Sequence, residues 1–300
     1  MKILNSTLCA ILLTALCLTS CKDDDQNQAE LPTAEEFQSV RQTALDNITQ
    51  NFQYPPGGTT SFTSNQGVQL DIYNCTDASG NQTTNMVDLE FVEIFDRGTM
   101  LVTNKPTMGV LPSGEQAILI SGGEFYFNAT EDGTQLEACG IQAVIPADLT
   151  GGVDYSMSLW EGNIDADGDL TWMPLGLEFG VDSSDYFVFI DDFGWINCDV
   201  FYDDPRPKTD ITVEVPAGYD NENSGVYFAI VGEQSGLGTL AGEFPIGLEA
   251  HVIFVTAEGT DWRYAVESIT VSENEVVTFE LTDTAVVTEA ELITIINDLP

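Results

Sequence analysis

Positive charge is scarce in this sequence. Eight lysine and arginine residues face 49 aspartate and glutamate residues among 300, which gives a formal net charge of -41 at pH 7. A surface charged almost entirely with one sign repels nucleic acid and anionic lipid head groups, and it leaves cations or cationic partners as candidates. The sequence therefore excludes nucleic acid as a partner. We interpret the acidic surface as a means of staying soluble in a saline environment. Repulsion between the charges is tolerable there because salt screens it over about 8 Å.

Histidine is also scarce, and the common catalytic motifs are lacking. His251 is the single histidine, and the chain has no CxxC pair, no GxSxG elbow and no glycine pattern of a P-loop or dinucleotide-binding turn. Zinc sites and Cys-His nucleophiles therefore have no support, and His251 has no nearby pattern of a nucleophile that would suggest a Ser-His-Asp triad. The composition is otherwise that of a folded protein, since 43% of the residues are hydrophobic and only 19% are charged.

The first 25 residues carry the most specific pattern. Lys2 precedes an apolar stretch from residue 3 to 18, which is too short and too interrupted by polar residues to span a bilayer, and Leu18-Thr19-Ser20-Cys21 ends it. This ending resembles the lipobox of bacterial lipoproteins, and the resemblance implies cleavage after residue 20 and lipidation of Cys21. The following Lys22-Asp23-Asp24-Asp25 resembles the export signal of Bacteroidetes-type surface lipoproteins, which implies the outer face of the outer membrane. The alternative is an ordinary secretory signal peptide with an incidental cysteine.

Cysteine usage agrees with export. Two of the six cysteines would leave with the signal peptide and Cys21 would carry the lipid, so Cys75, Cys139 and Cys198 remain. An odd number in an oxidising compartment indicates one disulfide and one buried thiol. We predict the pair Cys75 and Cys139, because both fall in the same predicted domain.

The part before residue 54 divides into a signal peptide, a tether and a helix. Residues 1–20 form the signal peptide, and residues 21–32 are charged and amide-rich, as in a tether. Residues 33–53 show a helical pattern, in which Thr33 and Glu36 fit a capping box and apolar side chains recur with helical spacing. Arg41 is the only basic residue on the polar face of this helix, which favours packing on the following domain over binding to a membrane surface.

From residue 54 onward the sequence predicts strands. Runs rich in β-branched and aromatic residues alternate with clusters of glycine, asparagine and aspartate, such as Asp96-Arg97-Gly98, which predict turns. The runs Val87–Phe95 and Ser121–Tyr126 resemble extracellular β-domains of uncharacterised surface lipoproteins, and this resemblance implies no catalytic motif. A capping-box pattern at Thr288 predicts a short C-terminal helix.

The expected fold is mainly β, with two to three β-sandwich modules of the Ig-like kind. We predict a first sandwich domain over 54–150, a second β unit over 151–217 and a third unit with the C-terminal helix over 218–300. The alternative is that the second and third units together form one domain.

One turn offers oxygen ligands at alternate positions. Asn163, Asp165, Asp167 and the Asp169 carbonyl would occupy the first four positions of an EF-hand-like loop, and this makes calcium the one cofactor that the sequence suggests. The twelfth position, where a bidentate glutamate belongs, is Pro174, and the flanks look like strands. The alternative is a β-hairpin whose turn is formed by Asp-Gly without metal.

A second acidic group suggests a glycosidase-like pair of carboxylates. Two carboxylates can act as acid and base on a glycosidic bond, and aromatic rings can stack on sugars. The group comprises Asp182, Asp185, Asp191, Asp192, Asp199, Asp203 and Asp204, interleaved with Tyr186, Trp195 and Tyr202. In the alternative, Trp195 is a core residue, and the loop from 203 to 208 is stabilised by local charge pairing.

Together these patterns predict a lipid-anchored surface protein whose body is a non-catalytic binding or structural module. Its partners would be the membrane, through the N-terminal lipid, and a surface protein or glycan. One rival hypothesis is a glycan-binding accessory lipoprotein of an uptake system, which requires that Trp160, Trp172 or Trp195 be exposed. The other rival is a carboxylate-dependent hydrolase, which requires that two acids of the second group face each other at about 5 to 10 Å.

Overall fold

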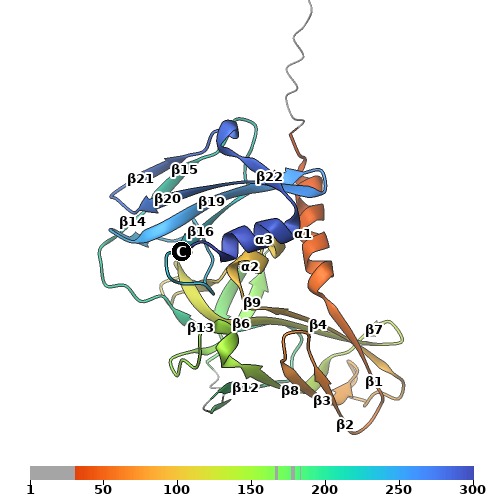
Figure 1. The fold of residues 1–300 in the computed structure, drawn as a ribbon. Coiled ribbons are helices and arrows are strands. Elements are labelled where there is room, and N and C mark those ends of the chain that lie inside the picture. The colour runs from red at the N-terminus through yellow and green to blue at the C-terminus, as the bar shows by residue number, and fades with distance from the viewer. Residues whose placement is uncertain (1–30, 166–167, 177–179, 183) are drawn as a thin grey trace, which may run out of the picture. The chain divides into compact units, whose positions relative to one another are not determined.

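The structure is a computed structural model that describes residues 31–165, 168–176, 180–182 and 184–300. The predicted signal peptide, Cys21, Asp167 and nearly all of the predicted tether lie outside these residues. Residues 32–300 form one compact unit. In the described part this unit is mainly β, with three α-helices (Figure 1). No helix of the described residues has the length and apolar character needed to cross a membrane.

The large sheet contains eight strands, and five of them pair in a closed circuit. The long strand β6 pairs with β4, β13 and β5, and the order continues from β13 through β9 and β10 back to β5. Most pairs are antiparallel, whereas β10 and β5 are parallel. The strands are β1 (Gln50–Tyr54), β4 (Val87–Ile94), β5 (Met108–Val110), β6 (Gln116–Glu131), β7 (Thr134–Gln135), β9 (Ser158–Ile164), β10 (Leu170–Pro174) and β13 (Gly194–Phe201).

A second sheet, here called the covering sheet, packs on one face of the large sheet. Side chains of both sheets share one core, which includes Phe91, Phe125 and Ile141, each with no exposed surface. A disulfide joins Cys75 to Cys139 in this core, which is the pairing that the sequence predicts. The strands are β2 (Thr59–Thr63), β3 (Gln69–Thr76), β8 (Ala138–Pro146), β11 (Gly180–Val181) and β12 (Asp185–Ile190).

Strands from 54–150 and from 151–217 lie side by side in both of these sheets. In the large sheet β6 pairs with β13, and in the covering sheet β8 pairs with β12. The sheets therefore do not follow the predicted boundary near residue 150, because each needs strands from both sides of it to bury its inner face.

The C-terminal sheet covers the other side of the helices. Its strands are β16 (Ser224–Ile230), β17 (Gly238–Thr239), β19 (Glu249–Glu258), β20 (Asp261–Thr270) and β22 (Ala285–Val287). Two short ribbons accompany it, β14 (Lys208–Thr209) with β18 (Phe244–Pro245) and β15 (Ile211–Glu214) with β21 (Glu275–Thr278). Two 3-10 turns complete the described elements, η1 (Ala147–Thr150) and η2 (Leu281–Asp283).

Three helices lie between the C-terminal sheet and the large sheet (Figure 1). They are α1 (Ala34–Ile48), α2 (Arg97–Thr103) and α3 (Glu289–Asn297). Thr33 caps α1 and Thr288 caps α3, each in a capping box with the glutamate three residues later. The three helices share a core with Trp160, Trp172 and Trp195 of the large sheet.

The predicted helix over 33–53 ends earlier than the sequence suggests. Residues 50–54 form β1 and pair with β4, so the helical spacing of Phe52 does not continue the helix. The ring of Phe52 packs 4.7 Å from that of Phe62, centroid to centroid. Pairing with a neighbouring strand overrides the local helical preference here.

The turn predicted at Asp96-Arg97-Gly98 is the start of a helix. Asp96 caps α2 by accepting a hydrogen bond from the Thr99 amide, and the two residues after it are helical. Gly98 is needed for packing and not for a turn, because a Cβ atom there would come within 2.5 Å of the Ile293 carbonyl oxygen of α3. The prediction was wrong because close helix contact, like a turn, selects glycine.

Candidate functional site

Half of the cations of the described body are buried. Six lysine and arginine residues follow residue 31, and three of them, Arg41, Arg97 and Lys105, expose 8%, 0% and 8% of their surface. A buried charge is costly unless it meets a counter-ion or hydrogen-bond acceptors. The partners of these three cations therefore show which of them serves the fold and which faces space that a ligand can fill.

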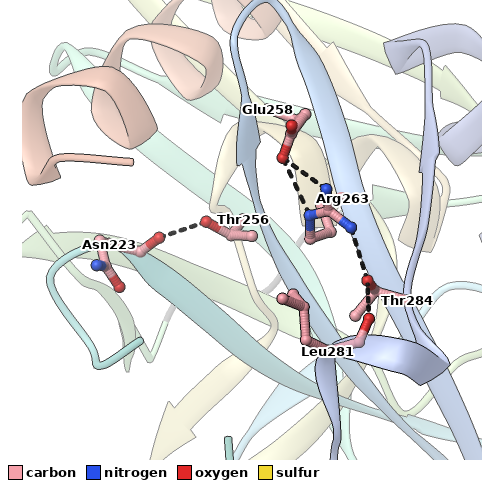
Figure 2. A network of polar contacts seen from close by, with 6 residues as sticks. All are labelled: Asn223, Thr256, Glu258, Arg263, Leu281 and Thr284. Atoms are coloured by element: carbon pink, nitrogen blue, oxygen red, sulfur yellow. Dashed lines mark hydrogen bonds and ion pairs between the residues drawn. The ribbon is translucent and has the colours of Figure 1, made fainter. Parts of the chain in front are cut away.

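Arg263 shows how a cation of this chain is satisfied within the protein. Its Nε and Nη2 atoms donate to Glu258 at 3.0 and 2.8 Å, and Nη1 donates to the Thr284 hydroxyl at 2.8 Å (Figure 2). Thr284 in turn donates to the Leu281 carbonyl at 2.8 Å, which ties the β19–β20 hairpin to η2. Across the described ranges, the other ion pair within 4.0 Å joins Arg206 to Asp204.

Arg97 is satisfied by backbone carbonyl groups. Its Nε donates to the Ile296 carbonyl at 2.8 Å, and its Nη1 donates to the Glu233 carbonyl at 3.3 Å. Its Nη2 donates to the Leu299 carbonyl. A cation at the C-terminal end of a helix satisfies free carbonyls and opposes the helix dipole, so Arg97 fastens α3 to the loop after β16.

Arg41 has fewer partners. Its Nη2 donates to the Tyr227 hydroxyl at 2.9 Å, and its guanidinium carbon lies 3.9 Å from the centroid of the Phe37 ring. The Tyr227 hydroxyl in turn donates a hydrogen bond to Asn104 Oδ1 at 2.6 Å. The Nε atom of Arg41 is buried and has no hydrogen-bond partner among the described residues. The guanidinium is thus held by a ring and a phenol and not by a carboxylate.

A cavity of about 380 Å³, here called the Arg41 cavity, opens beside this group. It lies between α1, the loop after α2, β16 and β15, and it contains charged, polar and apolar side chains. The residues that line it include Arg41, Asn104, Asp169, Val213, Val215, Asp220, Asn221, Ser224, Tyr227 and Leu240. Gly225 leaves room for the guanidinium, because a Cβ atom there would come within 2.9 Å of Arg41 Nη2.

Lys105 lies on the other side of the same loop. Its Nζ donates to the Thr103 carbonyl at 3.2 Å at the end of α2, and lies 5.3 Å from the centroid of a Trp195 ring. Burial lowers the pKa of Lys105 to about 8, although Glu124 acts in the opposite direction. Lys105, Tyr126 and Trp195 line a second cavity of about 530 Å³ between α1 and the large sheet. The contacts of the Lys105 amine are those of a helix cap.

Two carboxyl groups are buried on adjacent strands, and one of them, Glu124, interacts electrostatically with Lys105. Glu124 of β6 and Asp199 of β13 have no exposed surface, and burial raises the pKa of each well above its usual range. Asn197 donates to Asp199 Oδ2 at 2.6 Å and accepts from Ser121 at 2.8 Å. Both oxygens of Glu124 lack a hydrogen-bond partner in the described residues. Burial thus favours the protonated, uncharged form of both carboxyl groups.

The predicted calcium turn is a hairpin in the structure. β9 and β10 pair from Ile164 with Leu170, and Asp165 Oδ1 accepts a hydrogen bond from the Asp169 amide at 3.0 Å. Asn163 and Asp169 are exposed, and Asp167 lies outside the described residues. Among the described residues no cluster of three metal-binding side chains is found. Calcium binding by the complete turn stays a prediction.

The second acidic group is spread over several connections. Asp182 and Asp185 are linked through Ser184 in the turn before β12, Asp191 and Asp192 are exposed in the next turn, and Asp204 pairs with Arg206 at 2.5 Å. Asp199 is the buried member of this group, and its carboxyl neighbour is Glu124, which the sequence did not suggest.

The tryptophans proposed for sugar stacking are not on the surface. Trp160, Trp172 and Trp195 expose 3%, 0% and 6% of their surface, and the indole N–H groups of the first two donate to the carbonyls of Asp199 and Pro106. They are core residues, so a flat stacking platform built from them does not exist.

Cys198 and His251 are the remaining residues with side chains that could take part in catalysis. Cys198 is a free buried thiol, and burial raises its pKa, which keeps the thiol protonated and unreactive. His251 lies in β19 with Nδ1 2.9 Å from the Ser268 hydroxyl, and burial lowers the pKa of its imidazole. Cys198 is thus a core residue, and His251 and Ser268 are a cross-strand pair of β19 and β20.

The burial of Arg41 could have been predicted from its spacing along the first helix. We placed Arg41 on the polar face of the first helix, yet it follows Phe37 by four residues and precedes Ala44 by three, so it belongs to the buried stripe. A cation on an apolar stripe in a chain so poor in cations was the available clue. Lys105 and Glu124 had no comparable local signal, because strand pairing and loop packing bring them inside.

No protein-family model matches this chain, and no curated protein matches it.

Proposed function

We propose that this chain is a lipoprotein anchored through Cys21 and displayed on the outer face of an outer membrane, and that its body binds a ligand without converting it. The lipobox-like ending at Cys21 and the Lys-Asp-Asp-Asp that follows support the anchor and the address. The compact unit from Pro32 onward starts eleven residues after Cys21, which suits a body held close to the membrane by a short tether.

The Arg41 cavity is the observation that carries the binding function. Burying a cation without a carboxylate partner is costly to the fold, and Arg41, unlike Arg97, also keeps a buried N–H group without an acceptor in the described part of the chain, which a ligand would supply. The cavity has the size of small-molecule sites, and it combines apolar walls with a few polar groups. We further infer that the large and covering sheets form one sandwich-type module of this body.

Lipid labelling of the full chain in a diderm bacterium tests the anchor. An alkyne analogue of palmitate should label the wild-type protein and not Cys21→Ala, which should leave the membrane fraction. Cys17→Ala is the matched control, because Cys17 would be cleaved away, and it should keep the label. Label on Cys21→Ala would refute the anchor.

Protease treatment of intact cells tests the display. Wild-type body should be digested, whereas a variant with Asp23, Asp24 and Asp25 changed to alanine should keep its lipid and become protected. Equal digestion of both would show that the acidic residues are not the address.

A further inference from the structure

Arg41 has a donor capacity that the protein does not use. A guanidinium offers five N–H donors in a planar fork, and in the described residues Arg41 uses one of them, toward Tyr227. The acceptor is a neutral phenol oxygen, whose proton is committed to Asn104. No carboxylate of the described part lies within 4.0 Å of Arg41, although the chain has 49 acidic residues.

The guanidinium is fixed in place before any ligand arrives. The Phe37 ring lies against its face, Tyr227 holds one end, and the absence of a side chain at Gly225 gives it room. Fixing a long side chain in advance lowers the entropy cost of binding, and a planar fork suits a two-oxygen acceptor. Carboxylate is the acceptor with this geometry and a single charge.

The other charged groups of the cavity limit what the rest of the ligand can be. Asp169 and Asp220 line the same space, and both are exposed residues whose carboxylates offer hydrogen-bond acceptors and no donors. They favour hydroxyl donors near the carboxylate and oppose a second negative charge. The net charge of -41 adds to this, because it penalises each further negative charge on a ligand. A phosphate dianion or a polyanion is therefore disfavoured relative to a monoanion.

We propose that the Arg41 cavity binds a small hydroxylated carboxylate of the sugar-acid class, with the Arg41 guanidinium on the carboxylate and Asp169 and Asp220 on the hydroxyl groups. The sugar ring of this ligand would lie against the apolar wall of the cavity, which is formed by Val213, Val215 and Leu240. This proposal rests on the proposed binding function and specifies its ligand.

Calorimetric titration of the full mature chain in detergent tests the ligand class. The probes are D-glucuronate, D-galacturonate and N-acetylneuraminate, with D-glucose as the neutral partner of glucuronate and inorganic phosphate as the small dianion. At least one sugar acid should bind saturably below about 10 mM, and glucose and phosphate should bind at least about tenfold more weakly, as expected for the loss of one charged hydrogen bond.

Substitutions locate the site. Arg41→Lys keeps the charge and loses the fork, so affinity should fall about tenfold. Arg206→Lys is the matched control, because Arg206 pairs with Asp204 outside the Arg41 cavity, and it should bind as the wild type does. Val213→Trp places a large ring in the cavity and leaves Arg41 itself unchanged, so it should abolish binding, which covers the case in which Arg41→Lys does not fold.

Three results would overturn the proposal. They are the absence of saturable heat from all three sugar acids, equal affinity for glucuronate and glucose, and sugar-acid binding that survives Val213→Trp. Glucose binding that Val213→Trp removes would overturn the carboxylate class and keep the binding function. Binding that ignores both Arg41→Lys and Val213→Trp would overturn the site as well, while lipid labelling and surface exposure are measured independently.

Discussion

Replacing Lys105 with methionine tests whether burial between α2 and the large sheet lowers the pKa of Lys105 as the structure indicates. Burial lowers the pKa of Lys105 from 10.5 to about 8, and the side chain exposes 8% of its surface. The unfolded chain has an ordinary lysine pKa. The folded protein thus binds the proton less tightly than the unfolded chain does, by about 2.5 pKa units, or roughly 3 kcal/mol.

The sign of the pH dependence follows from this difference. Below pH 8 both states carry the proton, and the cost of burying the ammonium group is fully present. Between pH 8 and about 10.5 the folded state has released the proton while the unfolded state retains it, so the free energy of unfolding rises with pH. Methionine has a similar length and no charge, so its contribution is independent of pH.

The assay is urea denaturation followed by tryptophan fluorescence at several pH values from 7 to 10.5. The wild-type free energy of unfolding minus that of Lys105→Met should increase by roughly 3 kcal/mol over this range. The difference cancels the titration of Cys198 and of the buried tyrosines, which both proteins share. Lys208→Met, which removes the exposed lysine, should show no such change. A difference that stays constant with pH would show that the Lys105 ammonium remains hydrated, and the reasoning would fail.

Two further predictions concern the core. Changing Cys75 and Cys139 together to serine opens a loop of 64 residues and should lower the free energy of unfolding by about 4 kcal/mol in oxidising buffer, whereas Cys198→Ala should keep its sensitivity to reductant. Stability insensitive to reductant in the wild type would contradict the pairing. Glu124→Gln should stabilise the protein at pH 7 and not at pH 4, because the raised pKa of Glu124 opposes folding as pH rises above the ordinary value of 4.5. Glu267→Gln, at an exposed position of β20, is the control, and equal effects at both pH values would refute the assignment.

Local patterns in the sequence predicted the features that depend on a few neighbouring residues. The capping boxes at Thr33 and Thr288 depend on residues three positions apart, and the β-rich class follows from short runs and turn clusters. Local pattern failed where a distant strand or helix decides the outcome. Residues 50–54 are a strand because β4 lies beside them, and residue 98 is a glycine because α3 packs against it and not because a turn is needed.

The candidate site could be found only in part from the sequence. The Asp182–Asp204 group and the tryptophans were chosen for their chemistry, and the structure spreads the acids over turns and buries the rings. Arg41 could have been recognised from its place on the apolar stripe of α1. Its contact with Tyr227 spans 186 residues, however, and its cavity is closed by β15 and β16, which no local pattern links to the first helix.

Positive and negative charges are distributed differently between the interior and the surface of the body. Arg41, Arg97 and Lys105 lie inside, between the helices and the sheets, and the exposed charged groups of the described body are mostly acids. Repulsion on the surface is screened over about 8 Å in saline, whereas the buried cations are screened much less. A monoanion that enters the Arg41 cavity therefore leaves an unfavourable potential at the rim and meets an unscreened positive charge at the base. Raising the salt concentration should weaken the rim repulsion more than the inner attraction, so the affinity for a sugar acid should rise or stay constant with salt. Binding by surface cations would instead weaken.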